Sequence, residues 1–300
     1  MKSNRLFLIT VIFLSLMCGL SSCGKKKEDI DKKKKNEEKN EKKSYPSGNL
    51  AFYEIENKDV NKIELPKILK EISGIIITDD GRMFGHYDEL GAVFEIDTEN
   101  GEIKKTFYLK DKPEKDFEDI AYANGLFYMV TSKGDIYEFK EGNEQEEVDF
   151  TEYKTKLNTA NDIEGITYDP ETNSFIIACK GMGTENVFDK EKGFFKFDLN
   201  TKTLDMTPKF LINFENFKKD FNPSGIRLNP ATNTYFVISS TGNAIAELSK
   251  NGEVLGFKDL PGKVHSQPEG IAFDKEGNLY ISNEGADGNG NFIKYLKKGS

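Results

Sequence analysis

Histidine and cysteine are scarce in this sequence, which contains two and three of them among 300 residues, and tryptophan is absent. Zinc and copper sites are built largely from imidazole and thiolate ligands, so such a site is disfavoured. Cys179 is the one cysteine beyond residue 23, so no disulfide framework is possible. It follows apolar residues, and no Cys/His signature accompanies it. We therefore expect a buried thiol and not a nucleophile.

Long apolar runs are also lacking, apart from one at the N-terminus. Residues 6–20 are apolar, small or hydroxyl-bearing and follow Lys2 and Arg5, but they are too few for a membrane span of about 20 residues. The Leu-Ser-Ser-Cys-Gly segment that ends in Gly24 resembles the lipobox of bacterial lipoproteins. We expect residues 1–22 to be a cleaved signal peptide and Cys23 to carry the lipid that anchors the protein in a membrane. In the alternative, Cys23 is incidental to an ordinary signal peptide.

Residues 23–48 contain almost nothing apolar and are expected to form a disordered tether. Residues 25–43 carry ten Lys and six acids; without these and the two bases of the leader, 30 bases and 45 acids remain, so the body has a net charge of −15. That charge argues against nucleic-acid binding and is compatible with cation binding. Gly24 offers no obvious inner-membrane retention signal, so we expect the outer membrane, with the periplasmic and surface faces both open.

Five related motifs recur through residues 49–300, the expected folded domain. Their key residues lie at intervals of 45, 46, 60 and 45 and are Ser73, Glu118, Glu164, Ser224 and Glu269. In four motifs Gly follows the key residue, whereas Asp119 follows in the second. Four-stranded propeller blades take about 40–50 residues each. The spacing therefore predicts five blades with one insertion.

Each motif is followed by a turn and further apolar runs, as expected for hairpins. The second unit, for example, has Asn124-Gly125 between its first two runs. More polar segments at residues 102–109 and 253–260 have the character of exposed outer strands, and the one helix candidate is residues 214–221. We predict an all-β fold, a single five-bladed β-propeller.

The fifth unit stops soon after its third strand, so another segment must complete it. Residues 50–55 and 62–65 are strand-like and precede the first motif. We expect this N-terminal segment to close the last blade and remove the open sheet edge. The alternative is a six-bladed propeller with a degenerate blade in residues 181–222, in which residues 210–214 form a strand.

Three segments of the chain resemble the SdiA-regulated (YjiK-like) family. They are Leu-Pro-Lys-Ile-Leu-Lys-Glu-Ile-Ser-Gly-Ile at residues 65–75, Phe-Glu-Asp-Ile-Ala at 117–121 and Gln-Pro-Glu-Gly-Ile-Ala-Phe at 267–273. The resemblance runs from about residue 60 to 296. It implies a five-bladed propeller, distantly similar to NHL-repeat and strictosidine-synthase-like proteins, with a suggested calcium site and no established activity. Asp119 departs from the Gly of other blades and puts the local backbone path there in doubt.

The repeated carboxylates are the candidate site. The innermost strands of a propeller line its channel, so Glu118, Glu164 and Glu269 would face one another there, with Ser73 and Ser224 completing the ring. Calcium accepts six to eight oxygen ligands in flexible geometry and suits such a ring. Asn161 and Asn283, which lie close in sequence to two of the glutamates, are candidates to support it. Equally open is a structural role, in which the Glu side chains accept hydrogen bonds from backbone amides of neighbouring blades.

We expect a membrane-tethered, extracytoplasmic binding or scaffold module in preference to an enzyme. We expect it to be monomeric, with calcium in its channel and a protein or small-molecule ligand. The alternative is a calcium-dependent lactonase or esterase, in which the metal polarises a carbonyl. His86 and Asp88, at the end of the second strand of the first blade, are then candidates for acid–base work on the ligand face. No Gly-x-Ser-x-Gly elbow is present.

Overall fold

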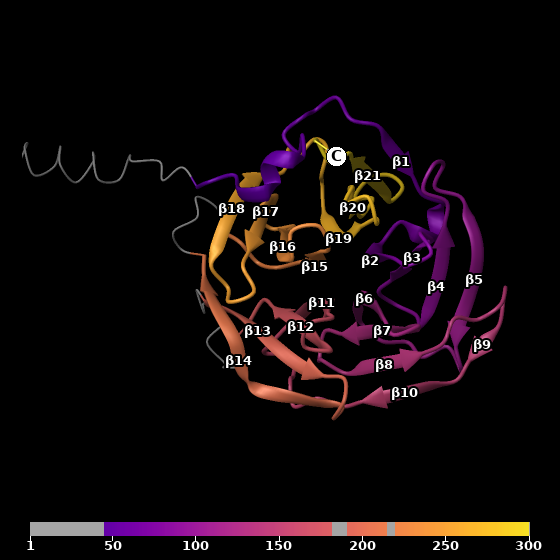
Figure 1. The fold of residues 1–300 in the computed structure, drawn as a ribbon. Coiled ribbons are helices and arrows are strands. Elements are labelled where there is room, and N and C mark those ends of the chain that lie inside the picture. Colours follow the sequence, from indigo (N-terminus) through magenta and orange to yellow (C-terminus); the bar gives the residue numbers. More distant parts are fainter. Residues whose placement is uncertain (1–44, 182–190, 215–219, 300) are drawn as a thin grey trace, which may run out of the picture. The chain divides into compact units, whose positions relative to one another are not determined.

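The computed structural model describes residues 45–181, 191–214 and 220–299, which form five sheets arranged in a ring (Figure 1). The strands of each blade are given from the channel outwards. Blade 1 contains β2 (Ile72–Ile77), β3 (Met83–Tyr87), β4 (Ala92–Ile96), β5 (Ile103–Leu109) and a short fifth strand, β9 (Glu147–Val148). Blade 2 contains β6 (Phe117–Ala123), β7 (Leu126–Thr131), β8 (Ile136–Phe139) and β10 (Phe150–Tyr153). Blade 3 contains β11 (Ile163–Asp169), β12 (Ser174–Cys179), β13 (Glu191–Asp198) and β14 (Thr203–Asn213). Blade 4 contains β15 (Gly225–Asn229), β16 (Thr234–Ser239), β17 (Ala244–Leu248) and β18 (Val254–Asp259). Blade 5 contains β19 (Pro268–Phe273), β20 (Leu279–Asn283), β21 (Asn291–Tyr295) and β1 (Lys62–Glu64). The five-bladed propeller is confirmed.

The six-bladed alternative is wrong, because the insertion in the third interval, between Glu164 and Ser224, extends an existing blade. It lengthens β14 to 11 residues, and Phe210, assigned to a strand of the sixth blade in that alternative, pairs with Phe194 of β13. The helix candidate at residues 214–221 includes residues 215–219, which lie outside the described part. Among the described residues, no helix has the length and apolar character needed to span a bilayer.

The N-terminal segment closes the ring, as predicted. Strand β1 pairs antiparallel with β21, and Figure 1 shows this indigo strand beside the yellow C-terminal one. The closure buries what would otherwise be an unpaired edge of blade 5. The propeller is therefore held shut by hydrogen bonds between its two chain ends.

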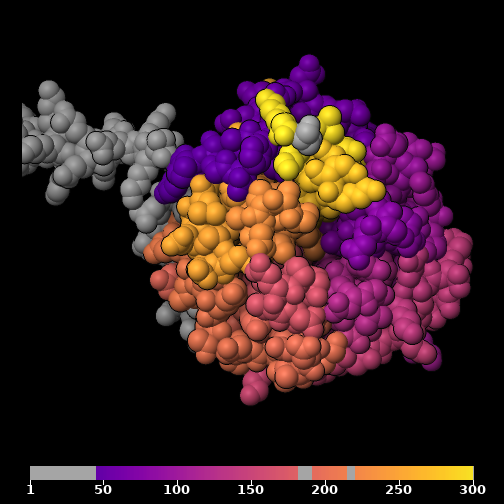
Figure 2. Space-filling view, viewed as in Figure 1, coloured from indigo at the N-terminus to yellow at the C-terminus, as the bar shows by residue number. Residues whose placement is uncertain are grey.

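The strand expected at residues 50–55 is not formed, and a 3₁₀ helix, η1 (Gly48–Phe52), lies there instead. The buried carboxylate of Glu247 on β17 accepts the backbone N–H of Asn49 at 2.6 Å and its side-chain amide at 2.5 Å. The backbone N–H of Asn49 therefore donates to a side chain and not to a neighbouring strand. Figure 2 shows the resulting contact, with indigo N-terminal residues lying against the orange and yellow blades.

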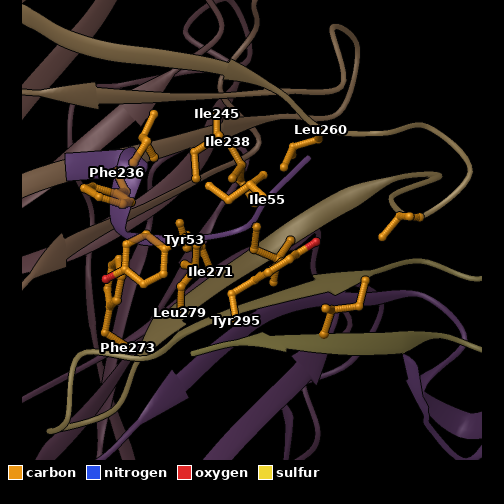
Figure 3. Packing of buried hydrophobic residues seen from close by; sticks show 14 residues of the cluster. Tyr53, Ile55, Phe236, Ile238, Ile245, Leu260, Ile271, Phe273, Leu279 and Tyr295 are labelled. Carbon is orange, nitrogen blue, oxygen red and sulfur yellow. The ribbon is translucent and has the colours of Figure 1, made fainter. Parts of the chain in front are cut away.

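Beyond η1, the chain packs into the core between blades 4 and 5 (Figure 3). Tyr53 meets Phe236 edge to face at 6.0 Å, and its hydroxyl donates to the carbonyl of Gly277 at 2.7 Å. Ile55 is fully buried in the same cluster. Burying a large side chain of this kind contributes about 1.5–3 kcal/mol. The N-terminal segment is thus part of the hydrophobic core as well as of the sheet.

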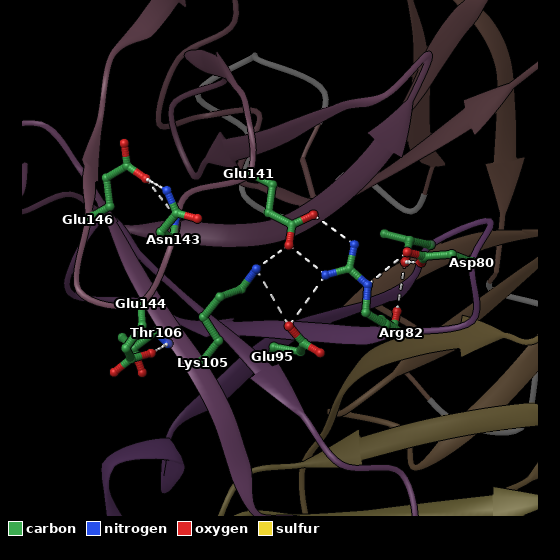
Figure 4. Close-up of polar contacts among 10 residues, drawn as sticks. Asp80, Arg82, Glu95, Lys105, Thr106, Glu141, Asn143, Glu144 and Glu146 are labelled. Carbon is green, nitrogen blue, oxygen red and sulfur yellow. Dashed lines mark hydrogen bonds and ion pairs between the residues drawn. The ribbon is translucent and has the colours of Figure 1, made fainter.

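Blades 1 and 2 are joined by a strand that the sequence did not reveal. After β8 the chain turns back, and β9 (Glu147–Val148) pairs in parallel with β5. Figure 4 shows Glu141 of this connection between Arg82 and Lys105 of blade 1; the Arg82 Nη2 to Glu141 Oε2 distance is 2.8 Å. A two-residue strand has no periodicity of its own, so only the neighbouring blade defines it.

Candidate functional site

The repeated motifs lie at the same end of the five innermost strands, which contact one another around the ring. Glycine allows this close approach. A Cβ on Gly165 would lie 2.9 Å from the side chain of Ile226, and one on Gly225 would lie 2.4 Å from the carbonyl oxygen of Glu269. In the four motifs that have it, Gly therefore serves the packing of neighbouring strands, and the residue before it is brought towards the channel.

Glu118, Glu164 and Glu269 come from blades 2, 3 and 5 and influence one another electrostatically. Burial, followed by repulsion from Glu164, raises the pKa of Glu118, and burial also raises the pKa of Glu164. Burial, followed by repulsion from Glu164 and then Glu284, raises the pKa of Glu269 to about 8. These carboxyl groups are poorly solvated and hold protons more tightly than ordinary glutamates.

Lys180, immediately after β12, lies among these acids and was not identified from the sequence. Its Nζ is 2.6 Å from Oε1 of Glu164, whose side chain is only 8% exposed. Burial opposes the charge on the ammonium, but Glu164, Asp162 and Glu269 raise the pKa of Lys180 above its ordinary value. We call Glu118, Glu164, Glu269 and Lys180 the acidic mouth.

The acidic mouth does not form a metal cage with its side chains as they lie. Within the described residues, no group of three or more His, Cys, Asp or Glu side chains is placed to hold a metal ion. The ammonium of Lys180 already neutralises Glu164. The oxygen donors have the right chemistry for calcium, but their arrangement would have to change. Calcium binding therefore stays a prediction.

The serine and asparagine candidates are occupied with structural contacts. Ser224 donates its hydroxyl to the carbonyl of Pro268 at 2.6 Å and thereby joins blades 4 and 5. Ser73 is buried, and its hydroxyl donates weakly to the carbonyl of Glu71 at 3.4 Å. Asn161 Oδ1 accepts from the backbone N–H of Asn158 at 3.1 Å, within a turn. Ser224 thus pins two neighbouring blades, and the alternative in which the Glu side chains accept backbone amides of neighbouring blades stays a prediction.

Asn283 and the two histidines are directed into the core. Asn283 Oδ1 lies 2.9 Å from His265 Nδ1, and His265 Nε2 lies 2.7 Å from the hydroxyl of Tyr295. His86 is fully buried, and burial lowers its pKa to about 4. The ring of His86 packs beside Gly74, whose missing side chain leaves room for it, and is not exposed on a surface of the propeller.

Asp88 lines a hollow of about 840 Å³ between blades 1 and 2. Asp116, another lining residue, also raises the pKa of Glu118, so the hollow lies next to the acidic mouth. Burial, followed by repulsion from Glu71, Glu89 and Asp116, raises the pKa of Asp88. The hollow therefore carries further acidic side chains next to the mouth, together with Lys115 and Lys133.

Below the mouth, the channel is closed by Arg227 of β15, which is 5% exposed. Its guanidinium donates to one carbonyl from the inner strand of each of the other four blades, at 2.9–3.1 Å: Ile75, Ile120, Ile166 and Ile271. Its Nη2 also contacts Asp119 Oδ1 at 3.1 Å. One side chain thus ties all five blades together at the axis.

Asp119 completes this central ion pair. Its carboxylate also accepts the backbone N–H groups of Ile120 at 2.8 Å and Ile166 at 2.9 Å. Burial raises its pKa to about 6, against the opposing influence of Arg227. Both residues are departures from the repeat, an Asp in place of Gly and an Arg where other blades have Ile, Ala or Thr. Asp119 is recognisable from the sequence as a departure from the repeat, but its pairing with Arg227 was not predicted.

Comparison with known proteins supports the fold. The family model described as SdiA-regulated matches residues 51–286. Glutaminyl cyclase from Myxococcus xanthus is 12% identical with a TM-score of 0.55, covering 79% of this chain and 94% of that one. A gluconolactonase from Xanthomonas campestris is 12% identical with a TM-score of 0.50, covering 75% and 72%. The aldose sugar dehydrogenase from Streptomyces coelicolor, in its PQQ-bound form, is 9% identical with a TM-score of 0.50, covering 80% and 99%. At these identities the similarity shows the fold alone.

Proposed function

This chain belongs to the SdiA-regulated family, and we propose that it is a membrane-tethered binding module of the cell envelope whose acidic mouth takes a cation, with calcium as the ligand. The observation that carries this proposal is the collection of Glu118, Glu164 and Glu269 at one end of the channel, with the pKa of each raised mainly by burial. A cation relieves the repulsion between such groups, and calcium tolerates irregular oxygen ligands.

A thermal melt tests calcium binding directly. We expect millimolar calcium to raise the melting temperature relative to EDTA, because a ligand at 100 times its dissociation constant adds about 2.7 kcal/mol to the free energy of unfolding. Differential scanning calorimetry of the full mature chain provides the measurement, with magnesium as the comparison ion. An identical melting temperature in calcium and EDTA would overturn the calcium assignment.

A paired variant separates a specific site from general ionic effects. Glu118→Gln/Glu269→Gln removes two carboxylates and leaves the Lys180 to Glu164 ion pair in place. We expect this variant to lose the calcium-dependent increase in melting temperature. The matched control is Glu276→Gln, whose side chain is 58% exposed and lies on a turn of blade 5. The control should keep the full increase.

The tether is a separate part of the proposal and rests on the sequence around Cys23. We propose that Cys23 is acylated and that residues 23–48 connect the lipid to the propeller at the outer membrane. Replacing Cys23 by Ala is expected to move the protein from the membrane fraction to the soluble envelope fraction and to abolish labelling with a radioactive fatty acid. Unchanged membrane association together with unchanged labelling would contradict the acylation.

Of the acid–base candidates in the hydrolase alternative, Asp88 lines the hollow beside the mouth, whereas the histidines lie in the core. His86 and His265 are the only histidines of the sequence, and both are fully buried in the structure. A general base must lie within hydrogen-bonding distance of the proton that it removes, and neither imidazole is exposed to solvent. Binding of a protein or small-molecule partner therefore stays the proposed function.

A further inference from the structure

Lys180 places its ammonium among the carboxylates at this end of the channel. Its ammonium contacts Glu164 at 2.6 Å, and its charge also acts on Glu118, Glu269 and Glu284. These acids come from blades 2, 3 and 5 and from the segment after β20. A single positive charge thus stabilises several carboxylates from different blades.

We infer that Lys180 is a built-in counterion that competes with the external cation and so sets the affinity of the acidic mouth. The inference rests on the proposed function, since it concerns the same site. With Lys180 in place, a cation gains Glu164 as a ligand only by breaking the Lys180 to Glu164 ion pair. Without it, Glu118, Glu164 and Glu269 lose this neutralising partner.

The position of Lys180 permits such an exchange. Its side chain is 33% exposed, so part of it already reaches solvent, whereas the side chain of Glu164 is 8% exposed and fixed on β11. An ammonium is a compact, hydrated charge on a flexible stem of four carbons. The lysine can therefore swing outwards when a cation enters, without any change in the strands that hold the carboxylates.

Calcium titration by isothermal calorimetry tests this role on the full mature chain in detergent. The variants are Lys180→Met, which removes the charge, and Lys180→Arg, which retains it. We expect Lys180→Met to bind calcium at least about tenfold more tightly than the unmodified protein, a difference of about 1.4 kcal/mol. Lys180→Arg should stay close to the unmodified protein. Lys298→Met, which removes a lysine paired with Glu54, is the distant control.

The outcomes distinguish this inference from the calcium proposal itself. Binding by Lys180→Met but not by the unmodified protein would support the competition and overturn calcium as the ligand of the natural chain. Equal affinities in both proteins would overturn the competition and leave the calcium site standing. Binding by neither would overturn both. Circular dichroism verifies folding, and Lys180→Gln replaces the Met variant if that one does not fold.

Discussion

Replacing Arg227 by Met is expected to lower the free energy of unfolding by about 3–5 kcal/mol, as found when one partner of a buried ion pair is removed. The variant leaves Asp119 buried without its cation and deprives the carbonyls of Ile75, Ile120, Ile166 and Ile271 of their shared donor. A stable domain has about 5–15 kcal/mol in total, so the loss is a large fraction. Urea unfolding followed by circular dichroism measures it.

The double variant Asp119→Asn/Arg227→Met is the matched control for the charge. Asn keeps an oxygen that can accept from the backbone N–H of Ile120 or Ile166 but carries no buried charge. We expect the double variant to recover part of the lost stability at pH 8. A loss below about 1 kcal/mol in Arg227→Met, within the range of ordinary surface substitutions and hydrogen bonds, would show that the axis is not held by this side chain.

Glu269→Gln should stabilise the protein in EDTA by about 2–4 kcal/mol at pH 8 and have almost no effect at pH 4.5. The pKa of Glu269 is raised from 4.5 to about 8, mainly by burial. Well below pH 4.5 the carboxyl is protonated in both the folded and the unfolded state. Between pH 4.5 and 8 the unfolded chain releases the proton while the folded protein retains it, so the carboxyl destabilises the fold progressively as the pH rises.

Gln carries no titrating proton, so the difference between variant and unmodified protein should grow across this pH interval. Glu276→Gln, at an exposed turn, is the control and should show no such growth. Melting temperatures from pH 4.5 to 8 provide the measurement. A stability difference independent of pH would mean that Glu269 is solvated in solution, and it would remove the main electrostatic support for the acidic mouth.

Most of the architecture followed from repetition in the sequence. The motif intervals identified five blades, and the alternation of turns and apolar runs located their strands. The strand expected at residues 50–55 is not formed, because hydrogen bonds from Asn49 to Glu247 of blade 4 hold the chain in another conformation despite its strand-like sequence. Such contacts join residues about 200 positions apart, and no local pattern encodes them. Strand β9 was missed for a similar reason, since it exists only as an addition to blade 1.

For the candidate site too, some features follow from the repeat and others only from the tertiary structure. The sequence by itself determined that Glu118, Glu164 and Glu269 occupy equivalent places in three blades, because a repeat assigns equivalent residues to equivalent positions. Only the tertiary structure decided what meets them. It brought Lys180 from the end of a second strand to Glu164, buried His86, and placed Arg227 on Asp119 at the axis. Lys180 reaches Glu164 within blade 3, across the pairing of β11 with β12. The burial of His86 and the contact of Arg227 with Asp119 depend on inter-blade distances and desolvation, which arise only when the ring closes.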